Sequence, residues 1–385
     1  MKMSVGWKKV FCVCVVLLVA GWGFWLGQFR NRQEWRPGFP LDKTKVRVGV
    51  IHISNMTDAG KGYAWAHDYG IQEMQAAVGL EDSQILRRVN VSDTNLPATE
   101  YAIRECIAEG ANIIIATSWN HMDVCEKLAE EFPGVVFANA TGFKSNATNL
   151  TNYFGKVHQP RYLSGIVAGL RTRSNKIGYV AAHGRENSEV TGGIDAFALG
   201  VASVNSEAVI HVQVTKRWFD PDGEYQAART LIEKGCDVIA QHCNTSSAQK
   251  AAQDAGVWGI GYNVDMKSDA PEAVITSVVW NWGIYYTELI RSVIDGTFVT
   301  TPWYGDMKSG IVTLTPLSEK LAPEGAEKAV EAAKAAIERG DFNVFDGEIL
   351  TNAGQVVGVK GGTLPDEEII RGIHWYCHNV VSPQE

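Results

Sequence analysis

From residue 46 onwards, the sequence alternates regularly between short apolar runs rich in Val and Ile and longer segments with helical spacing. The apolar runs include "KVRVGVIHI" and "NIIIATS", and the helical segments include "YAWAHDYGIQEMQAAVG", which ends at Gly79, and "NHMDVCEKLAEEFP". A strand that is apolar along its whole length must be covered on both faces, which is typical of a parallel sheet lying between helices. The pattern therefore predicts an α/β protein.

The alternation occurs twice. The first cycle ends with the helical segment "HQPRYLSGIVAGLRT", and a second begins with "KIGYVAA". This predicts two doubly wound α/β lobes, residues 46–157 and 158–280, in line with the two-domain expectation for 385 residues. The remaining segments favour a helix, a short strand pair ("PWYGDMKSGIVTLT") and a terminal helix ("EGAEKAVEAAKAAIERG"). Part of 281–310 is expected to cross back to the first lobe and part of 311–385 to complete the second.

Residues 1–37 differ from the rest of the chain. A basic start is followed by the uncharged run "VFCVCVVLLVAGWGFWLG", which is about as long as a bilayer-spanning helix. A signal peptide and an uncleaved signal anchor both fit this pattern. No convincing cleavage site follows the run and no lipobox precedes a Cys, which favours the anchor slightly. Either alternative predicts that the body of the protein is exported.

Charge and cysteine usage narrow the function classes. Residues 1–37 carry a net charge of +5 out of a total of −8, so the net charge of the remaining chain is −13. An acidic body argues against nucleic acid or a polyanion as the ligand and suits a neutral or cationic small molecule.

The five cysteines of the body lack zinc-ligand spacing. Isolated buried thiols are favoured over a Cys236–Cys243 disulfide, which stays open as an alternative.

Several predicted strands are followed by aromatic side chains with amides or carboxylates nearby. In open α/β sheets, ligands bind beyond the carboxyl ends of the strands, so two facing sheets are expected to form one cleft. Aromatic rings can stack on a flat heterocycle, and neighbouring polar groups can form hydrogen bonds with its edge. Packing beneath the loops is the alternative for each single ring. The candidate ligand-binding residues are Tyr63, Trp65, Trp119, Asp123, Trp218, Phe219, Gln241, Asn263, Asp265 and Trp280.

The stretch "KRWFDPDGEYQ" shows how such a strand end is built. Asp220 is suited to cap the following helix, and Pro221 is suited to its first turn. The two rings of Trp218 and Phe219 are then available to face either the cleft or the core.

The sequence shows no recognisable catalytic set. HExxH, GxSxG and the phosphate-binding GxxxxGK[ST] pattern do not occur, and the nine His are scattered. Asp123 and Asp265 stand without a nucleophile or metal-ligand set, so hydrogen bonding to a ligand is their simpler role. We expect no enzyme activity, no cofactor and no metal.

From about Lys45 to the C-terminus, the chain resembles the basic membrane protein (Bmp) family of ABC-importer substrate-binding proteins, which includes purine nucleoside receptors. The resemblance is carried, in order, by "VGVIHI", "DAGKGYAWAHDYG", "IIIATSWNHMD", "FANATGFKS", "GYVAAHGRENSEVTGGIDAFALGVASVN", "WFDPDGE", "VIAQHCNTS", "IGYNVDM" and "VVWNWGIYY". It implies a type I periplasmic-binding-protein fold, with two α/β lobes on a hinge that close on a ligand and deliver it to a permease.

Residue by residue, the resemblance implies a purine ring stacked between aromatics of the two lobes. Trp218 matches the second-lobe ring, either Tyr63 or Trp65 lies near the first-lobe ring, and Asp123 matches a carboxylate that reads the base edge. Where nucleoside-binding members hold ribose with an Asp and a Lys, this chain has Asn263 and Trp280. This departure disfavours a sugar and favours a free base such as adenine, with Asp265 as a further polar partner.

The leading hypothesis is therefore the periplasmic or extracytoplasmic binding component of an ABC importer, with a purine base or nucleoside-like small molecule as ligand and an inner-membrane permease as partner. The alternative is a membrane-anchored sensory or regulatory binding protein for a nucleoside or similar molecule. The uncleaved-looking leader favours this alternative. The short segment before the apolar run, which leaves no room for an output domain, weakens it.

Overall fold

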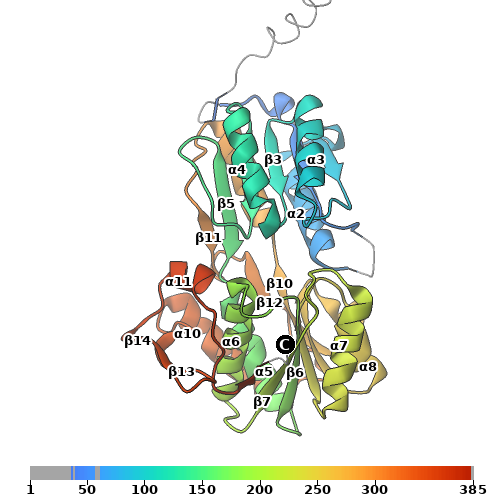
Figure 1. Cartoon of the computed structure of the whole chain (residues 1–385), viewed down its shortest axis with the longest axis vertical. Coiled ribbons are helices and arrows are strands. Elements are labelled where there is room, and N and C mark those ends of the chain that lie inside the picture. Colours follow the sequence, from blue (N-terminus) through green and yellow to red (C-terminus); the bar gives the residue numbers. More distant parts are fainter. Residues whose placement is uncertain (1–35, 38–39, 57–60, 383–385) are drawn as a thin grey trace, which may run out of the picture.

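The computed structural model describes residues 36–37, 40–56 and 61–382. Residues 1–35 of the predicted leader lie outside these ranges. Within the ranges, no helix combines the length and the apolarity needed to cross a membrane. The described chain forms two α/β lobes stacked along the long axis of the molecule (Figure 1), which is the predicted fold class.

The first lobe contains a six-stranded sheet in the order β11-β5-β4-β3-β1-β2, and all of its pairs are parallel. Each of its inner strands is a short, fully buried run, such as "IIIA" in β3. The strands are β1 (Val48–Ile51), β2 (Ile85–Arg88), β3 (Ile113–Ala116), β4 (Val136–Ala140), β5 (Leu150–Gly155) and β11 (Trp303–Gly305).

The second lobe contains a seven-stranded sheet in the order β12-β10-β9-β8-β6-β7-β15. Its pairs are parallel except for β10 with β12, which is antiparallel. The strands are β6 (Lys176–Ala181), β7 (Val209–Val214), β8 (Val238–His242), β9 (Trp258–Asn263), β10 (Val274–Trp280), β12 (Val312–Leu314) and β15 (Val380–Val381).

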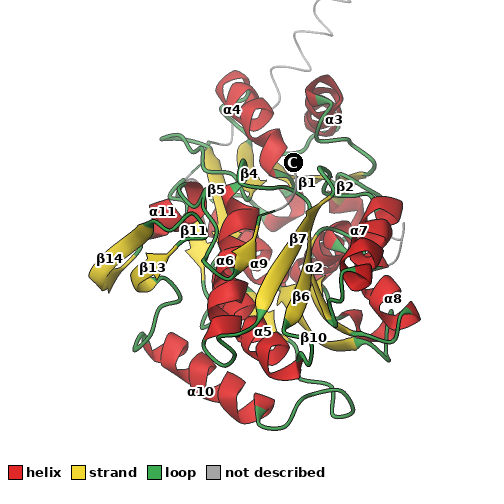
Figure 2. Cartoon of the chain, turned by 60° about the horizontal axis from the view of Figure 1, so that its bottom comes forward, coloured by secondary structure: helices red, strands yellow, loops and turns green. Residues whose placement is uncertain are grey.

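Helices cover both faces of each sheet, as continuously apolar strands require. In the first lobe, α3 and α4 pack on one face with a core that includes Ile114 and Phe137, and α2 and α9 pack together on the other. In the second lobe, α5 and α6 lie on one side of the sheet and α7 and α8 on the other (Figure 2). The helices are α2 (Tyr63–Val78), α3 (Leu96–Ala108), α4 (Met122–Glu131), α5 (His158–Arg171), α6 (Ser188–Ala202), α7 (Pro221–Glu233), α8 (Ser247–Asp254), α9 (Gly283–Asp295), α10 (Ala326–Arg339) and α11 (Asp366–Arg371).

Two predicted helix boundaries are confirmed. Helix α2 ends at Gly79, whose φ of 74° places it in the left-handed region that a glycine adopts readily. At the start of α7, the side chain of Asp220 accepts a hydrogen bond from the amide of Gly223, and Pro221 occupies the first turn. The cap fixes the direction in which the chain enters α7 from the preceding aromatic pair.

The chain passes between the two sheets three times: from β5 to β6, from β10 to β11 and from β11 to β12. The prediction of a short strand pair in "PWYGDMKSGIVTLT" is wrong in its pairing. Strands β11 and β12 form, but β11 pairs with β5 and β12 with β10, because each extends the edge of a different sheet. These crossings are the only covalent connections between the lobes in the described chain.

The C-terminal part contains elements that the sequence pattern did not predict. A hairpin of β13 (Asp346–Leu350) and β14 (Val356–Thr363) follows α10, and α11 and β15 come next. Its strands are largely exposed, so they lack the buried apolar pattern on which the strand predictions depended. The five cysteines within the described chain are free and buried, which confirms isolated thiols.

Candidate functional site

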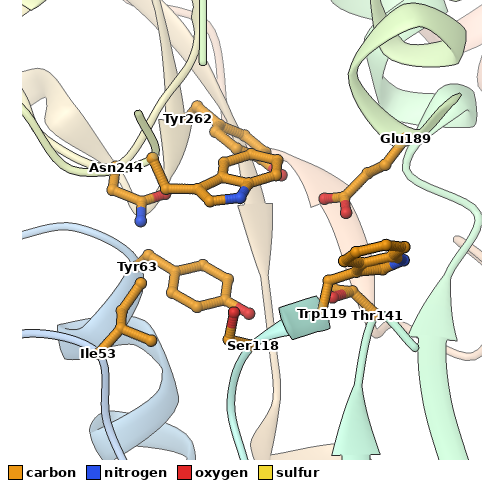
Figure 3. Close-up of a pocket in the computed structure, with 9 residues that line it drawn as sticks. Ile53, Tyr63, Ser118, Trp119, Thr141, Glu189, Asn244 and Tyr262 are labelled. Atoms are coloured by element: carbon orange, nitrogen blue, oxygen red, sulfur yellow. The ribbon is translucent and has the colours of Figure 1, made fainter. Parts of the chain in front are cut away.

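A pocket lies between the two lobes (Figure 3), with about 320 Å³ of space that is free of atoms and partly open to solvent. The first lobe contributes Ile53, Tyr63, Ser118, Trp119 and Thr141, and the second contributes Glu189, Trp218, Asn244 and Tyr262.

The topology of the sheets explains why the pocket lies here. In each lobe, the strand order reverses at the first strand, so that β1 lies between β2 and β3, and β6 lies between β7 and β8. Such switch points open a crevice beyond the carboxyl ends of the strands. Most of the pocket residues follow the ends of β1, β3, β4, β6, β7 and β8, and Tyr262 lies within β9 near its carboxyl end.

Tyr63 is the first residue of α2, and its backbone forms a hydrogen bond between the two lobes. Its amide donates a hydrogen bond to the carbonyl oxygen of Asn244, at 3.3 Å. The preceding residue, Gly62, lies so close to the same carbonyl that a Cβ atom would be 1.9 Å from the oxygen. The lobes are therefore in a closed arrangement in which backbone meets backbone at the edge of the pocket.

The two pocket tryptophans come from opposite lobes. Trp119 begins a short 3₁₀ helix after β3 and is 38% exposed, with its ring centroid 6.3 Å from that of Phe143. Trp218 follows β7, and its carbonyl oxygen accepts a hydrogen bond from the amide of Asn244 at 2.9 Å. Its ring makes an edge contact with His183, with the centroids 4.9 Å apart. Both rings are thus held by neighbours while lining the pocket.

Thr141 adds a strained backbone position to the pocket wall. It follows β4 with a φ of 59°, in the left-handed region that a β-branched residue rarely adopts. Its amide donates to the carbonyl oxygen of Tyr153 at 2.9 Å, which holds the conformation. Backbone strain of this kind gathers at ligand sites.

Glu189 contributes a carboxyl group to the pocket. It lies in the first turn of α6, and Asn187 caps the N-terminus of this helix. Figure 3 shows its side chain pointing into the pocket toward Trp119. The side chain is only 12% exposed, and its Oε1 lies 3.7 Å from Nε2 of the buried His242. The fully buried Arg161 packs its guanidinium 4.0 Å from the ring of Tyr262, behind the pocket wall.

Burial shifts the titration of these groups in the direction of their neutral forms. Burial raises the pKa of Glu189 from 4.5 to about 8, against the opposing charge of Arg161. It lowers the pKa of His242 well below 6.5, with a smaller contribution from Arg161. Burial also raises the pKa of the Tyr63 hydroxyl well above 10. At neutral pH, the pocket therefore presents mainly uncharged hydrogen-bonding groups, which suit an uncharged ligand.

This arrangement predicts a pH dependence of stability. Because the folded state holds the Glu189 proton up to a pH of about 8 and the unfolded state only to about 4.5, the contribution is complete below pH 4.5 and is lost as pH rises through 8. In thermal melts of the ligand-free protein, we expect Glu189→Gln to reduce the fall in melting temperature between pH 5 and pH 9. Glu331→Gln, on the exposed face of α10, is the control and should leave the fall unchanged. An identical fall in the wild type and Glu189→Gln would contradict the assignment.

Of the ten predicted binding residues, the structure brings Tyr63, Trp119 and Trp218 together in the pocket. Trp65 lies outside it, stacked on Tyr69 with ring centroids 4.9 Å apart and with Lys61 Nζ 4.8 Å from its ring. Residues two apart on a helix point in different directions, so Tyr63 and Trp65 cannot both face the cleft.

The two predicted carboxylates also lie outside the pocket. Asp123 is 67% exposed and forms an ion pair with Lys144, at 2.9 Å, on the wall of a neighbouring open hollow. Asp265 caps a short 3₁₀ helix and pairs with Lys267 at 3.4 Å. Both are thus engaged at the surface, where water solvates the charge.

The two predicted amides are buried behind the pocket. The Gln241 side chain donates to the carbonyl oxygen of Thr245 at 2.7 Å and accepts from Gln249 at 2.9 Å, so the protein itself uses its hydrogen-bonding groups. Asn263 adopts a φ of 69° and donates to the carbonyl oxygen of Cys243 at 3.4 Å. Its Oδ1 has no hydrogen-bond partner within the described chain.

The remaining two predicted aromatics do not line the pocket either. Phe219 is half-buried beside Trp218. Trp280 is 5% exposed and stacks on Trp282 with centroids 4.4 Å apart. Its indole nitrogen donates to the hydroxyl of Tyr262 at 3.1 Å, so it supports a pocket residue from behind.

The sequence prediction missed six pocket residues. A signal was present for three of them. Ser118 is the last residue of the predicted strand "NIIIATS", Thr141 directly follows a predicted strand, and Asn244 lies in the segment "VIAQHCNTS". Glu189 lies beyond the end of the "KIGYVAA" strand, which becomes β6, and no candidate residue was predicted at this strand end. The other two are Ile53 and Tyr262. Among the described residues, no group of His, Cys, Asp and Glu could hold a metal ion.

Comparison with known proteins agrees with this architecture. A purine-binding protein of Brucella abortus is 32% identical over 368 residues, which are 95% of this chain and 98% of that protein. A Haloferax volcanii protein, named as a candidate ABC transporter glucose-binding protein, is 33% identical over 80% of this chain and 76% of its own length. The structure of an ABC transporter solute-binding protein from Aeropyrum pernix aligns with a TM-score of 0.67 at 16% identity, covering 77% of this chain and 92% of that one.

The family model described as "ABC transporter substrate-binding protein PnrA-like" matches residues 45–341. Substrate-binding proteins of this kind are extracytoplasmic transport components that bind a small molecule and work with a membrane permease. The two lobes, the closed interface and the pocket between them are the features that such a role requires. The chain therefore belongs to the Bmp family of ABC transporter substrate-binding proteins.

Proposed function

We propose that the protein captures a free purine base similar to adenine, or a related flat heterocycle, and that hinge closure clamps the ring between aromatic side chains of the two lobes. The single observation that carries this proposal is the composition of the pocket. Tyr63 and Trp119 come from the first lobe and Trp218 from the second, and all three line the same pocket.

The polar groups of the pocket support a ligand with a hydrogen-bonding edge. A protonated Glu189 both donates and accepts, as does the carboxamide of Asn244, and a purine edge carries both donors and acceptors. We propose that Glu189 takes the role that the resemblance assigned to Asp123, because Asp123 pairs with Lys144 at the surface.

Contacts from both lobes also supply a reason for closure. A ligand shifts an open–closed equilibrium only through its differential affinity for the two states. Each aromatic stack contributes on the order of 1 kcal/mol beyond burial, and each hydrogen bond contributes about 0.5–1.5 kcal/mol net. A ring held by two stacks and several hydrogen bonds then reaches a Kd in the micromolar range or below, after the cost of closure is subtracted.

One expectation from the resemblance favours a free base over a nucleoside. Asn263 and Trp280 stand where the resemblance places the Asp and Lys that hold ribose in nucleoside-binding members, and both are buried behind the pocket. The name of the Brucella relative, a purine-binding protein, agrees with the ligand class.

A sugar is the second candidate, and the name of the Haloferax relative favours it. Aromatic rings also stack on sugars, and the hydroxyls of Ser118 and Thr141 lie at the pocket wall. The candidates differ in what must fill the pocket, because a planar ring needs two opposed aromatic faces and a sugar needs many polar partners.

Isothermal titration calorimetry with adenine, adenosine and glucose tests the proposal. We expect adenine to bind with a Kd in the micromolar range or below. The added ribose should crowd the closed interface between the lobes, and overpacking costs about 1–3 kcal/mol, so adenosine should bind about 5- to 150-fold more weakly. Saturable binding of glucose with no response to adenine would replace the proposal with the second candidate.

We also propose that the protein works on the periplasmic or extracytoplasmic side of the inner membrane, either released or held there by its leader. The family role and the acidic body support this location. Mass spectrometry of the N-terminus of the native protein distinguishes the released form from the anchored one. The anchored form would favour the sensory alternative only if deletion of the leader left ligand uptake by the cell intact.

A further inference from the structure

The C-terminal segment of residues 342–382 lies beyond the part of the chain that the family model matches. It is attached firmly to the second lobe. The amide of Cys377 donates to the buried carboxyl group of Asp195 at 2.7 Å, and the side chain of Asn379 donates to the carbonyl oxygen of Ala198 at 3.0 Å. Strand β15 extends the second sheet by pairing with β7. The segment therefore moves with the second lobe.

Within this segment, α11 packs against the start of α6, the helix that carries Glu189. The hydroxyl of Ser188 donates to the carbonyl oxygen of Ile370, and His374 Nδ1 lies 2.6 Å from the carbonyl oxygen of Arg185. Ser188 is the neighbour of the pocket residue Glu189 along the chain. Helix α11 thus supports the turn from which the carboxyl group of the pocket projects.

The same helix reaches the first lobe and the crossing between the lobes. Figure 1 shows α11 at the height where the chain passes from one lobe to the other. Asp366 pairs at 2.8 Å with Lys156, which lies in the β5–α5 crossing. The guanidinium of Arg371 lies 5.1 Å from the ring centroid of Phe143, in the loop after β4 of the first lobe. Phe143 in turn neighbours the pocket residue Trp119.

We propose that residues 342–382, called the strap from here on, stabilise the closed state. The contact between Arg371 and Phe143 is the interaction by which the strap binds the first lobe. Phe143 belongs to the loop between β4 and β5 and moves with the first lobe, whereas Arg371 is anchored to the second, so this contact is made only when the lobes approach. The strap rests on the proposed function in one respect, since it presupposes lobes that open and close around a ligand.

The expected strength of the strap is modest, as suits a protein that must release its ligand. Arg371 and Phe143 are 45% and 38% exposed, respectively, and a cation–π contact at an exposed site shifts an equilibrium by about two- to fivefold. The strap therefore biases closure without locking it.

A double-mutant cycle of Arg371→Ala and Phe143→Ala tests the strap with two readouts. The first needs no ligand: the amide of Tyr63 is hydrogen-bonded across the lobes to Asn244, so its hydrogen exchange, followed by mass spectrometry, reports opening. We expect about two- to fivefold faster exchange in each single variant and no further increase in the double variant. Arg339→Ala is the control. It removes an exposed arginine at the end of α10 that pairs with Asp341, and it should leave the exchange rate of Tyr63 unchanged.

The second readout is the dissociation rate of adenine, measured by stopped-flow fluorescence, which should rise by the same factor in the same non-additive way. Unchanged Tyr63 exchange in both single variants, or a double variant whose effect is the product of the two, would overturn the strap. If adenine does not bind while the exchange result holds, the proposed ligand fails and the strap stands.

Discussion

Gly62→Ala should abolish most of the ligand affinity while leaving the fold intact. The added Cβ would lie 1.9 Å from the carbonyl oxygen of Asn244 on the opposite lobe, and this close approach exists only where the two lobes meet. The substitution therefore penalises closure and spares each separate lobe. Overpacking typically costs about 1–3 kcal/mol, and the apparent affinity falls with the population of the competent state, so a Kd about 5- to 150-fold higher is expected.

The measurement pairs calorimetry with adenine and thermal melts of the ligand-free protein. Gly192→Ala, in α6, is the matched control, because its Cβ would meet its nearest neighbour, Cδ1 of Ile373, at 3.4 Å, which is an ordinary contact. We expect the control to bind adenine as the wild type does. Wild-type affinity in Gly62→Ala would show that binding does not need this closed interface. A large fall in the melting temperature of Gly62→Ala would show that the glycine serves the fold instead.

Trp218→Ala should weaken adenine binding about 5- to 150-fold, because an aromatic stack on a base is worth about 1–3 kcal/mol by alanine substitution. Trp218 is half-buried at the pocket, with its ring held by an edge contact to His183. The loss should appear mainly as faster dissociation. Trp218→Phe keeps an aromatic face and should recover part of the affinity.

Trp65→Ala is the control for this prediction. Trp65 is also half-buried and also stacked on a neighbouring ring, but it lies outside the pocket. We expect its replacement to change the Kd by less than about twofold, since surface substitutions usually have effects within about 0.5 kcal/mol. Equal losses in Trp65→Ala and Trp218→Ala, or no loss in either, would argue against stacking on Trp218.

The sequence predicted the two-lobed α/β architecture because fully buried strands such as "IIIA" leave a strong apolar signal. It also predicted the cap of α7 at Asp220, since capping depends on neighbouring residues alone. The partners of β11 and β12 were beyond its reach. Which sheet edge a three-residue strand joins is decided by the path of the whole chain and not by the strand's own residues.

For the site, strand ends located the pocket, but the pattern did not decide the direction of each side chain. Tyr63 and Trp65 have the same character in sequence, and only the rotation of α2 brings the first into the pocket. Asp123 and Glu189 show the same limit. Asp123 pairs with Lys144, in the loop after β4, and stays at the surface. Glu189 is largely buried in the closed interface beside His242 and lines the pocket.

A crystal structure of the protein grown with adenine tests the central claim most directly. The account predicts the base in the pocket between the lobes, with its ring faces against Tyr63 and Trp218 and its polar edge within hydrogen-bonding distance of Glu189 or Asn244. A base bound elsewhere, or one whose faces contact no aromatic ring, would contradict it.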